Sequence, residues 1–320
     1  WPDVKHADNI ALGMRPLDDP RERAKVCVRC HVGGKDRVAT HAMMAAGHPR
    51  LRFELDTYTE LWRTSGGREH FRRDADYAAR KSAASGRSVW IAGLIETARQ
   101  RLDLIAAAQR RAAVPWPEFA NFNCYSCHRD MRVSEWSAAA GGSVPGQLRF
   151  DDSALRVLAA AFTGIGAPLG AKLRAATDAW QRAAAEPAAL EAAQTALRAA
   201  LDEAASGAAA VAAGGPARAA GILEALIDAA NAGQFPDYAA AEQAAMAMAL
   251  LLAEQDVNVR RRADIDALFD ALAEDHRFDP RLFRDRFKAV TPTSRRLNQP
   301  EQRVDGFYTG YTHKILNRGA

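Results

Sequence analysis

Two copies of one short motif contain all four cysteines of the chain. The motifs are Cys27–His31 (Cys-Val-Arg-Cys-His) and Cys124–His128 (Cys-Tyr-Ser-Cys-His). In each, two residues separate the cysteines and a histidine directly follows the second. The thiols of such a motif add to the two vinyl groups of a porphyrin, and the histidine then ligates the iron. The sequence therefore predicts two c-type haems, attached at Cys27, Cys30, Cys124 and Cys127, with His31 and His128 as proximal iron ligands.

Other uses of four cysteines fit this pattern less well. Two disulfides are plausible in an exported protein. A redox-active dithiol needs a βαβ context, which the sequence does not contain. Two Cys-x-x-Cys pairs could also bind one zinc ion, but a zinc ribbon does not require a histidine after each second cysteine. Covalent haem accounts for both histidines, so it is the favoured interpretation.

The distal iron ligands are predicted among the remaining histidines, first of all His41 and His48. Ala and Met between them favour helix, and Gly47 and Pro49 mark its end. Because seven residues make almost two turns, both imidazoles are expected to point the same way, about 10.5 Å apart along the axis. Each could ligate one iron of a stacked pair, or one could ligate iron and the other hydrogen-bond a propionate.

A third distal candidate is His70, which follows a glycine turn at residues 66–67. A loop can aim a ligand with freedom that a helix lacks. Methionine ligation would raise the redox potential, and three methionines are near the motifs. The methionine alternatives are Met43, Met44 and Met131, and the histidines expected at the surface are His6, His276 and His313.

The net charge of +4 is concentrated in the N-terminal part of the chain. No basic stripe alternates with aromatic residues, so nucleic-acid binding is not expected. We expect the positive charge to bind haem propionates instead, because arginine binds carboxylates through a bidentate fork. The arginines near the motifs are Arg15, Arg37, Arg50, Arg52, Arg72 and Arg73.

Periodicity predicts an all-α chain. Residues 1–136 are interpreted as a two-haem cytochrome domain, with helices from Leu51 to Trp62 and from about Ser88 to Ala113, where Ile91, Leu94 and their successors recur at helical spacing. Residues 137–150 are a predicted linker. Residues 151–290 are Ala-rich, and Gly and Pro divide them into seven predicted helices of an antiparallel bundle. Residues 291–320 are a predicted C-terminal arm.

The predicted cofactor also predicts a location. No apolar run approaches the roughly 18–20 residues that span a bilayer, and the first residues do not resemble a signal peptide. Haem is attached to such motifs outside the cytoplasm on exported chains. We therefore expect a periplasmic or otherwise extracytoplasmic protein without a transmembrane segment, numbered from after a cleaved signal peptide.

Three segments resemble a family of exported bacterial two-haem cytochromes. They are the first motif, the stretch His41–Leu55 with its Ala-Gly-His-Pro-Arg-Leu core, and Trp116–His128 with its Trp-Pro-Glu-Phe lead-in. The resemblance covers most of residues 25–136. It implies distal histidine ligation and electron transfer. The family has a His-Trp pair after the first motif, where this chain has His70-Phe71.

Electron transfer between unidentified redox partner proteins is the leading functional hypothesis. If both irons hold two histidines, no position is open for a substrate, and the potentials are expected to be low. One alternative is a haem enzyme with an open distal position, acting on peroxide, a nitrogen oxide or a sulfur species. Another is a haem-carrying subunit of a larger respiratory complex, with the haem-free half as its interaction module.

Overall fold

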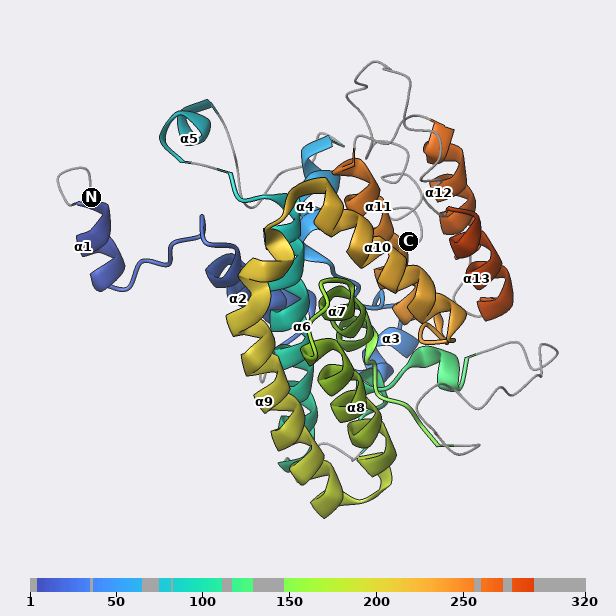
Figure 1. The fold of residues 1–320 in the computed structure, drawn as a ribbon. Helices are drawn as coiled ribbons and strands as arrows, with labels where there is room; N and C mark the ends of the chain where they lie inside the picture. Colours follow the sequence, from blue (N-terminus) through green and yellow to red (C-terminus); the bar gives the residue numbers. More distant parts are fainter. Residues whose placement is uncertain are drawn as a thin grey trace.

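The computed structural model describes residues 5–34, 37–64, 75–81, 83–110, 117–128, 147–255, 260–272 and 278–290. Within these ranges every regular element is a helix, and the β-type pairings are isolated bridges, Gly34 with Arg37 and Phe122 with Phe150. The all-α prediction is therefore confirmed (Figure 1). Over the same ranges, no helix combines the length and apolarity needed to cross a bilayer.

The helical segments before residue 130 are α1 (His6–Ala11), α2 (Pro20–His31), α3 (His41–Ala45), α4 (Leu55–Thr64), α5 (Ala75–Arg80), α6 (Gly86–Arg110), η1 (Phe119–Asn121) and η2 (Cys124–Ser126). The helix predicted from about Ser88 to Ala113 is α6, whose bounds, Gly86–Arg110, are close to the predicted ones. The predicted start of α4 at Leu51 was wrong. The Glu54 carboxylate accepts hydrogen bonds from the backbone N–H groups of Asp56 and Thr57, at 2.9 and 2.7 Å, and so caps the helix at Leu55.

All seven helices predicted after residue 151 are present. They are α7 (Ser153–Gly164), α8 (Leu169–Arg182), α9 (Pro187–Ala212), α10 (Gly215–Asn231), α11 (Tyr238–Ala253), α12 (Arg260–Asp270) and α13 (Pro280–Ala289), with the short η3 (Ala183–Ala185) after α8. Pro187 and Pro280 open their helices, because proline at the first helical position removes an N–H that has no intrahelical partner.

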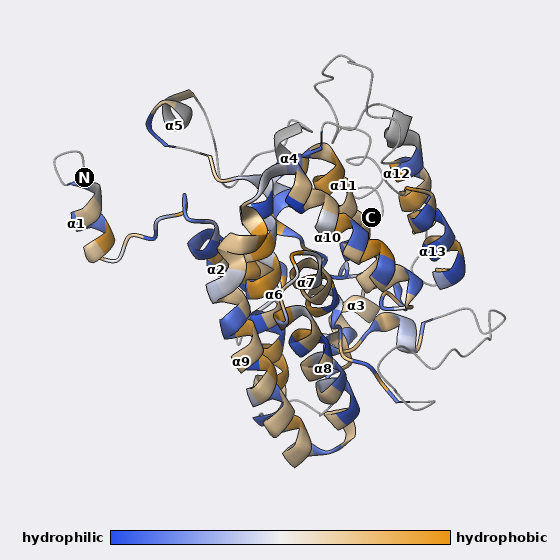
Figure 2. Cartoon of the chain, viewed as in Figure 1, coloured by the Kyte–Doolittle hydropathy of each residue, from blue (hydrophilic) through white to orange (hydrophobic). Residues whose placement is uncertain are grey.

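Helices from both halves of the chain contribute to one hydrophobic core. α7 packs against α6, α8, α10 and α11, and α6 also packs against α2, α4 and α9. Trp90 of α6 and Trp180 of α8 are fully buried in this core. Peripheral helices are two-sided: in Figure 2, α13 carries both hydrophobic and hydrophilic colours, and it buries Phe283 and Phe287 while Arg281 and Lys288 are exposed. The predicted division at residues 137–150 remains a prediction.

Candidate functional site

The first motif occupies the last turn of α2. Asp19 caps this helix by accepting a hydrogen bond from the Arg21 backbone N–H at 2.8 Å, and Pro20 is its first residue. Cys27 and Cys30 are three residues apart on the helix, so their thiols lie on one side of it. Cys27 is half-buried, and this burial raises the pKa of its thiol, whereas Cys30 is exposed. The spacing thus presents two thiols to one ligand beside α2.

His31, the last residue of α2, lies among aromatic side chains. Its ring stacks on Phe53, with centroids 4.7 Å apart and an interplanar angle of 20°. The ring of Tyr58 meets the His31 ring edge-on at 6.3 Å. Burial raises the pKa of the Tyr58 hydroxyl, with a further contribution from Glu242, so this hydroxyl is neutral at ordinary pH. The His31 side of the first motif is thus aromatic, a setting against which a porphyrin ring could pack.

The second motif lies in a turn, η2, that is fastened to the C-terminal half. The Asn123 backbone N–H donates to the Arg149 carbonyl at 2.7 Å, and Phe122 forms its bridge with Phe150. The rings of Phe122 and Phe150 stack at 4.8 Å, and Phe150 stacks on the buried Trp180 at 4.6 Å. These contacts hold the chain immediately before Cys124 against the core.

His41 lies against the histidine of the second motif. The ring centroids of His41 and His128 are 6.1 Å apart, with an interplanar angle of 32°. Two imidazoles that ligate one metal ion from opposite sides have ring centroids about 6 Å apart, since each metal–nitrogen bond is about 2 Å and each nitrogen lies about 1 Å from its ring centroid. The separation therefore fits a shared iron, and the donor set of two imidazoles and two nearby thiols fits a c-type haem.

His48 does not share a helix with His41, so the predicted alignment of the two imidazoles was wrong. α3 has only five residues, and Gly47 adopts φ +104°, which allows the His48 backbone N–H to bond the Met43 carbonyl at 3.0 Å and end the helix. The exposed His48 ring instead has its Nδ1 2.7 Å from the carbonyl oxygen of Pro49. The structure does not bring His48 to either motif histidine.

Of the other predicted site residues, some lie within the described ranges and others do not. Met43 is exposed and Met44 half-buried, both on α3. The side chain of His6 is not described. Several predicted residues lie outside the described ranges, and these are His70, Arg72, Arg73, Met131, His276 and His313.

The predicted propionate-binding arginines that are described already make contacts within the chain. Arg15 pairs with Glu22, and an Arg37 nitrogen lies 3.8 Å from the sulfur of Cys30. The Arg52 guanidinium donates to the Tyr238 hydroxyl at 3.0 Å and lies 4.8 Å from the centre of that ring. Arg50 lies 4.0 Å from Asp151. Of these four, Arg37 is the one placed beside a motif cysteine.

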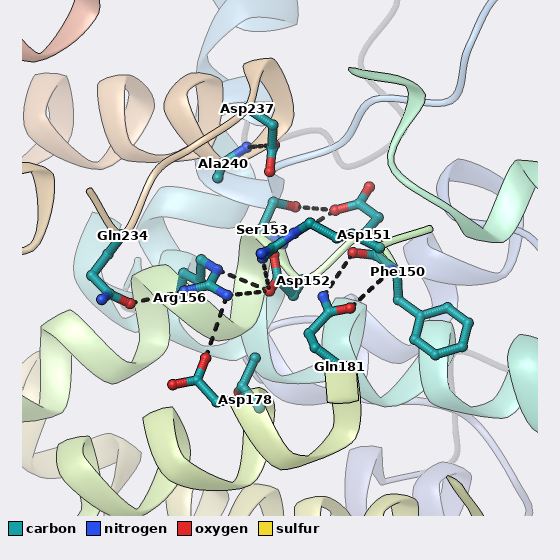
Figure 3. A network of polar contacts seen from close by, with 12 residues as sticks. Phe150, Asp151, Asp152, Ser153, Arg156, Asp178, Gln181, Gln234, Asp237 and Ala240 are labelled. Carbon is teal, nitrogen blue, oxygen red and sulfur yellow. Dashed lines mark hydrogen bonds and ion pairs between the residues drawn. The ribbon is translucent and has the colours of Figure 1, made fainter. Parts of the chain in front are cut away.

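A buried polar network lies at the junction of the second-motif segment with α7 and α11 (Figure 3). The Asp152 carboxylate accepts from Arg156 at 2.8 Å and from Arg149 at 3.1 Å. Arg156 also donates to Gln234 at 2.8 Å. The Gln181 amide exchanges two hydrogen bonds with the backbone of Phe150, at 3.0 and 2.9 Å. The network thereby holds the backbone at Phe150, which forms a bridge with Phe122 just before the second motif.

The carboxyl groups of the network differ in their proton affinity. Burial alone would raise the pKa of Asp152, but Arg156 and Arg149 outweigh it and hold that pKa below its ordinary value. The pKa of Asp151 is likewise held below its ordinary value, because the charges of Arg101 and Arg50 outweigh the effect of its burial. Asp237 has a raised pKa, because burial and the charge of Asp152 outweigh its favourable partners. Two carboxylates of the network are thus strongly ionised, and the third favours its proton.

Glu118 is a site residue to which the sequence analysis gave no role. One oxygen of its carboxylate accepts from the His41 backbone N–H at 2.9 Å and from the Ala120 backbone N–H at 3.0 Å. The available signal was its position just before a short helical turn, where an acidic side chain can cap.

Comparison with known proteins gives no relative: no family model, no curated protein and no solved structure matches the chain. Among the described residues, no three His, Cys, Asp or Glu side chains cluster closely enough to hold one metal ion, so the two cysteine pairs do not converge on a common zinc site.

Proposed function

We propose that this chain is an electron-transfer protein that carries two c-type haems, one attached at Cys27 and Cys30 and the other at Cys124 and Cys127. The observation that carries the proposal is the 6.1 Å separation of the His41 and His128 rings. His41 belongs to a distant segment of the sequence, and its separation from His128 is one that a second imidazole ligand to the same iron would need.

The surface around this histidine pair supports a large apolar ligand. Phe119 is 49% exposed, and it is among the few large hydrophobic side chains that the described surface leaves open. Phe119 meets the His41 ring edge-on at 5.7 Å. A porphyrin held between His41 and His128 would cover such side chains, whose burial is favourable by about 25 cal/mol per Å² of apolar area.

Haem bound at each motif would supply an iron that cycles between the ferric and ferrous states. The residues of the chain then decide how this iron is used. His41 and His128 would fill both axial positions at the second motif and exclude a substrate there. Phe53 and Tyr58 would keep water from the His31 ring at the first motif. At the second motif, two imidazole ligands favour electron transfer over catalysis at that iron.

The proposal extends to location and partners. Because haem is attached to such motifs outside the cytoplasm, we infer an exported, periplasmic protein that exchanges electrons with other redox proteins. Membership of a larger respiratory complex is compatible with this function.

The carbon monoxide difference spectrum of the dithionite-reduced protein tests the electron-transfer proposal. Carbon monoxide binds ferrous haem only where an axial position is open or weakly held. We expect no spectral change, because the proposed function requires a second strong ligand at each iron, which would be His41 at the second motif. A ferrous–CO band would contradict this function and favour the enzyme alternative, which would then be tested with small oxidants at that haem.

A further inference from the structure

α3, the helix that begins with His41, is held to the molecule without buried side chains. None of its five residues is buried, and His41 itself is exposed. Helices of this length are unstable alone, because the conformational entropy lost in nucleating a helix exceeds the free energy gained from one turn of hydrogen bonds. Something other than core packing must therefore fix the position of His41.

The Glu118 carboxylate makes a hydrogen bond that joins the backbone of α3 to the segment of the second motif. As the first residue of α3, His41 has a backbone N–H with no partner inside its own helix. Thr40 caps the helix by accepting from Met43 at 3.2 Å, which leaves the His41 N–H to Glu118, at 2.9 Å. Hydrogen bonds to an ionised acceptor are about twice as strong as those between neutral groups.

The other contacts of Glu118 belong to the second motif. The same carboxylate oxygen caps η1 through the Ala120 N–H, and η1 leads directly to Phe122 and Asn123, which are fastened to the core. His128 follows in the same segment. One half-buried side chain thus ties the backbone of His41 to the segment that carries His128.

We propose that Glu118 is a positioning residue that holds His41 opposite His128 and thereby keeps the second haem iron six-coordinate. This inference rests on the proposed function. Glu118 does not touch the iron site itself; it acts through the backbone of His41. Its loss should leave haem attachment at Cys124 and Cys127 intact and free the distal position.

The test compares Glu118→Ala and Glu118→Gln in the full-length, haem-loaded protein. Glutamine keeps an oxygen acceptor, so it should restore the contact. His41→Ala is the positive control, and Glu191→Ala, on the exposed face of α9, is the matched control. Intact mass establishes that each variant carries two haems, and the carbon monoxide difference spectrum then reports open iron.

We expect a ferrous–CO band equivalent to one haem per chain in Glu118→Ala and His41→Ala, and no band in the parent, Glu118→Gln or Glu191→Ala. If Glu118→Ala gives no ferrous–CO band while His41→Ala gives one, the role of Glu118 is overturned and the two-haem function stands. A silent His41→Ala would also overturn it. A parent chain without covalent haem would refute the function as well.

Glu118→Asp provides the test if Glu118→Ala does not fold. Its shorter carboxylate cannot span both N–H groups at their present distances, so it should give a partial ferrous–CO band. A CO-silent Glu118→Asp that carries both haems would overturn the proposal.

Discussion

His41 illustrates how tertiary contacts select one residue among equivalent candidates. In the sequence, His41 and His48 flank a predicted helix and His70 follows a glycine turn, and nothing local decides among the three. In the structure, a glycine-terminated turn directs His48 to Pro49, and a glutamate beyond residue 110 holds His41 near His128. The proposed proximal histidines follow from a local motif, whereas a proposed distal ligand depends on contacts between distant segments.

Substitution of His41 and His48 separates these roles. We expect His41→Ala to open one iron of the reduced protein to carbon monoxide, because it removes one of the two rings at the second motif. His48→Ala should leave the spectrum unchanged, because its exposed ring contacts the Pro49 carbonyl. The measurement is the carbon monoxide difference spectrum, and the reverse pattern would assign the distal position to His48.

The raised pKa of Asp237 predicts how the stability of the fold depends on pH. Its pKa is raised by burial and then by Asp152, so its folded value exceeds its unfolded value. Its contribution to stability is therefore present below the unfolded pKa and is lost as the pH rises through the folded pKa. Above that pH the buried carboxylate destabilises the fold. Asp237→Asn removes this charge and keeps the cap on Ala240.

We expect Asp237→Asn to raise the free energy of unfolding at pH 7 and to differ little from the parent near pH 3.5. Asp237→Ala is the control, because it also loses the helix cap, at a cost of about 1 kcal/mol. Urea unfolding across this pH range measures both variants. A lower stability of Asp237→Asn at pH 7 would mean that the carboxylate is favourably bound.

At the scale of elements, the crossing of α7 and α10 requires two glycines. A Cβ on Gly164 would lie 2.5 Å from the Ile222 Cα and 2.6 Å from the Gly221 carbonyl oxygen. Backbone atoms cannot move aside as a flexible side chain can. The two helices therefore approach more closely than side chains would allow.

Gly164→Ala should lower the free energy of unfolding by about 1–3 kcal/mol, the usual cost of overpacking. The matched control is Gly207→Ala within α9, where the nearest atom is a ring carbon of Phe162 at 3.2 Å, which can shift. Its effect should be smaller. Thermal or urea unfolding compares the two, and equal effects would mean that the α7–α10 crossing adjusts as easily as the Phe162 ring does.

The helices that the sequence predicted well have local signals. α9 and α13 begin at prolines, and α6 has a long apolar repeat, so their positions follow from short-range rules. α4 began later than predicted because Glu54, an uncommon cap, ends the preceding loop. α3 was shorter than predicted because Gly47 closed it after one turn. Alanine content alone does not distinguish one turn from two.

At the scale of the whole molecule, Asp151 joins the two halves of the chain. It lies two residues before α7 and forms an ion pair with Arg101 of α6, with the charged atoms 2.8 Å apart. No sequence pattern predicted this pair, because its partners come from segments with different compositions. The change of composition near residue 150 predicted a boundary, which stays a prediction, and apolar residues from both sides of residue 150 lie in one core.

Asp151→Asn should lower the free energy of unfolding by about 3 kcal/mol, because removal of one partner leaves the other charge without its counterion in a buried site. The matched control is Asp202→Asn, which removes a surface partner of Arg99 and should cost no more than about 0.5 kcal/mol. Urea unfolding at pH 7 measures both. Equal effects would show that burial adds nothing to the Asp151 pair.

Covalent attachment of two haems is the claim on which the proposed function depends, and intact mass spectrometry tests it most directly. The chain is produced in a periplasm equipped for c-type haem maturation, as the parent and as two variants with the cysteines of one motif replaced by alanine. We predict a mass increase of two haems for the parent and of one haem for each variant. A parent with the mass of the bare polypeptide would contradict the claim.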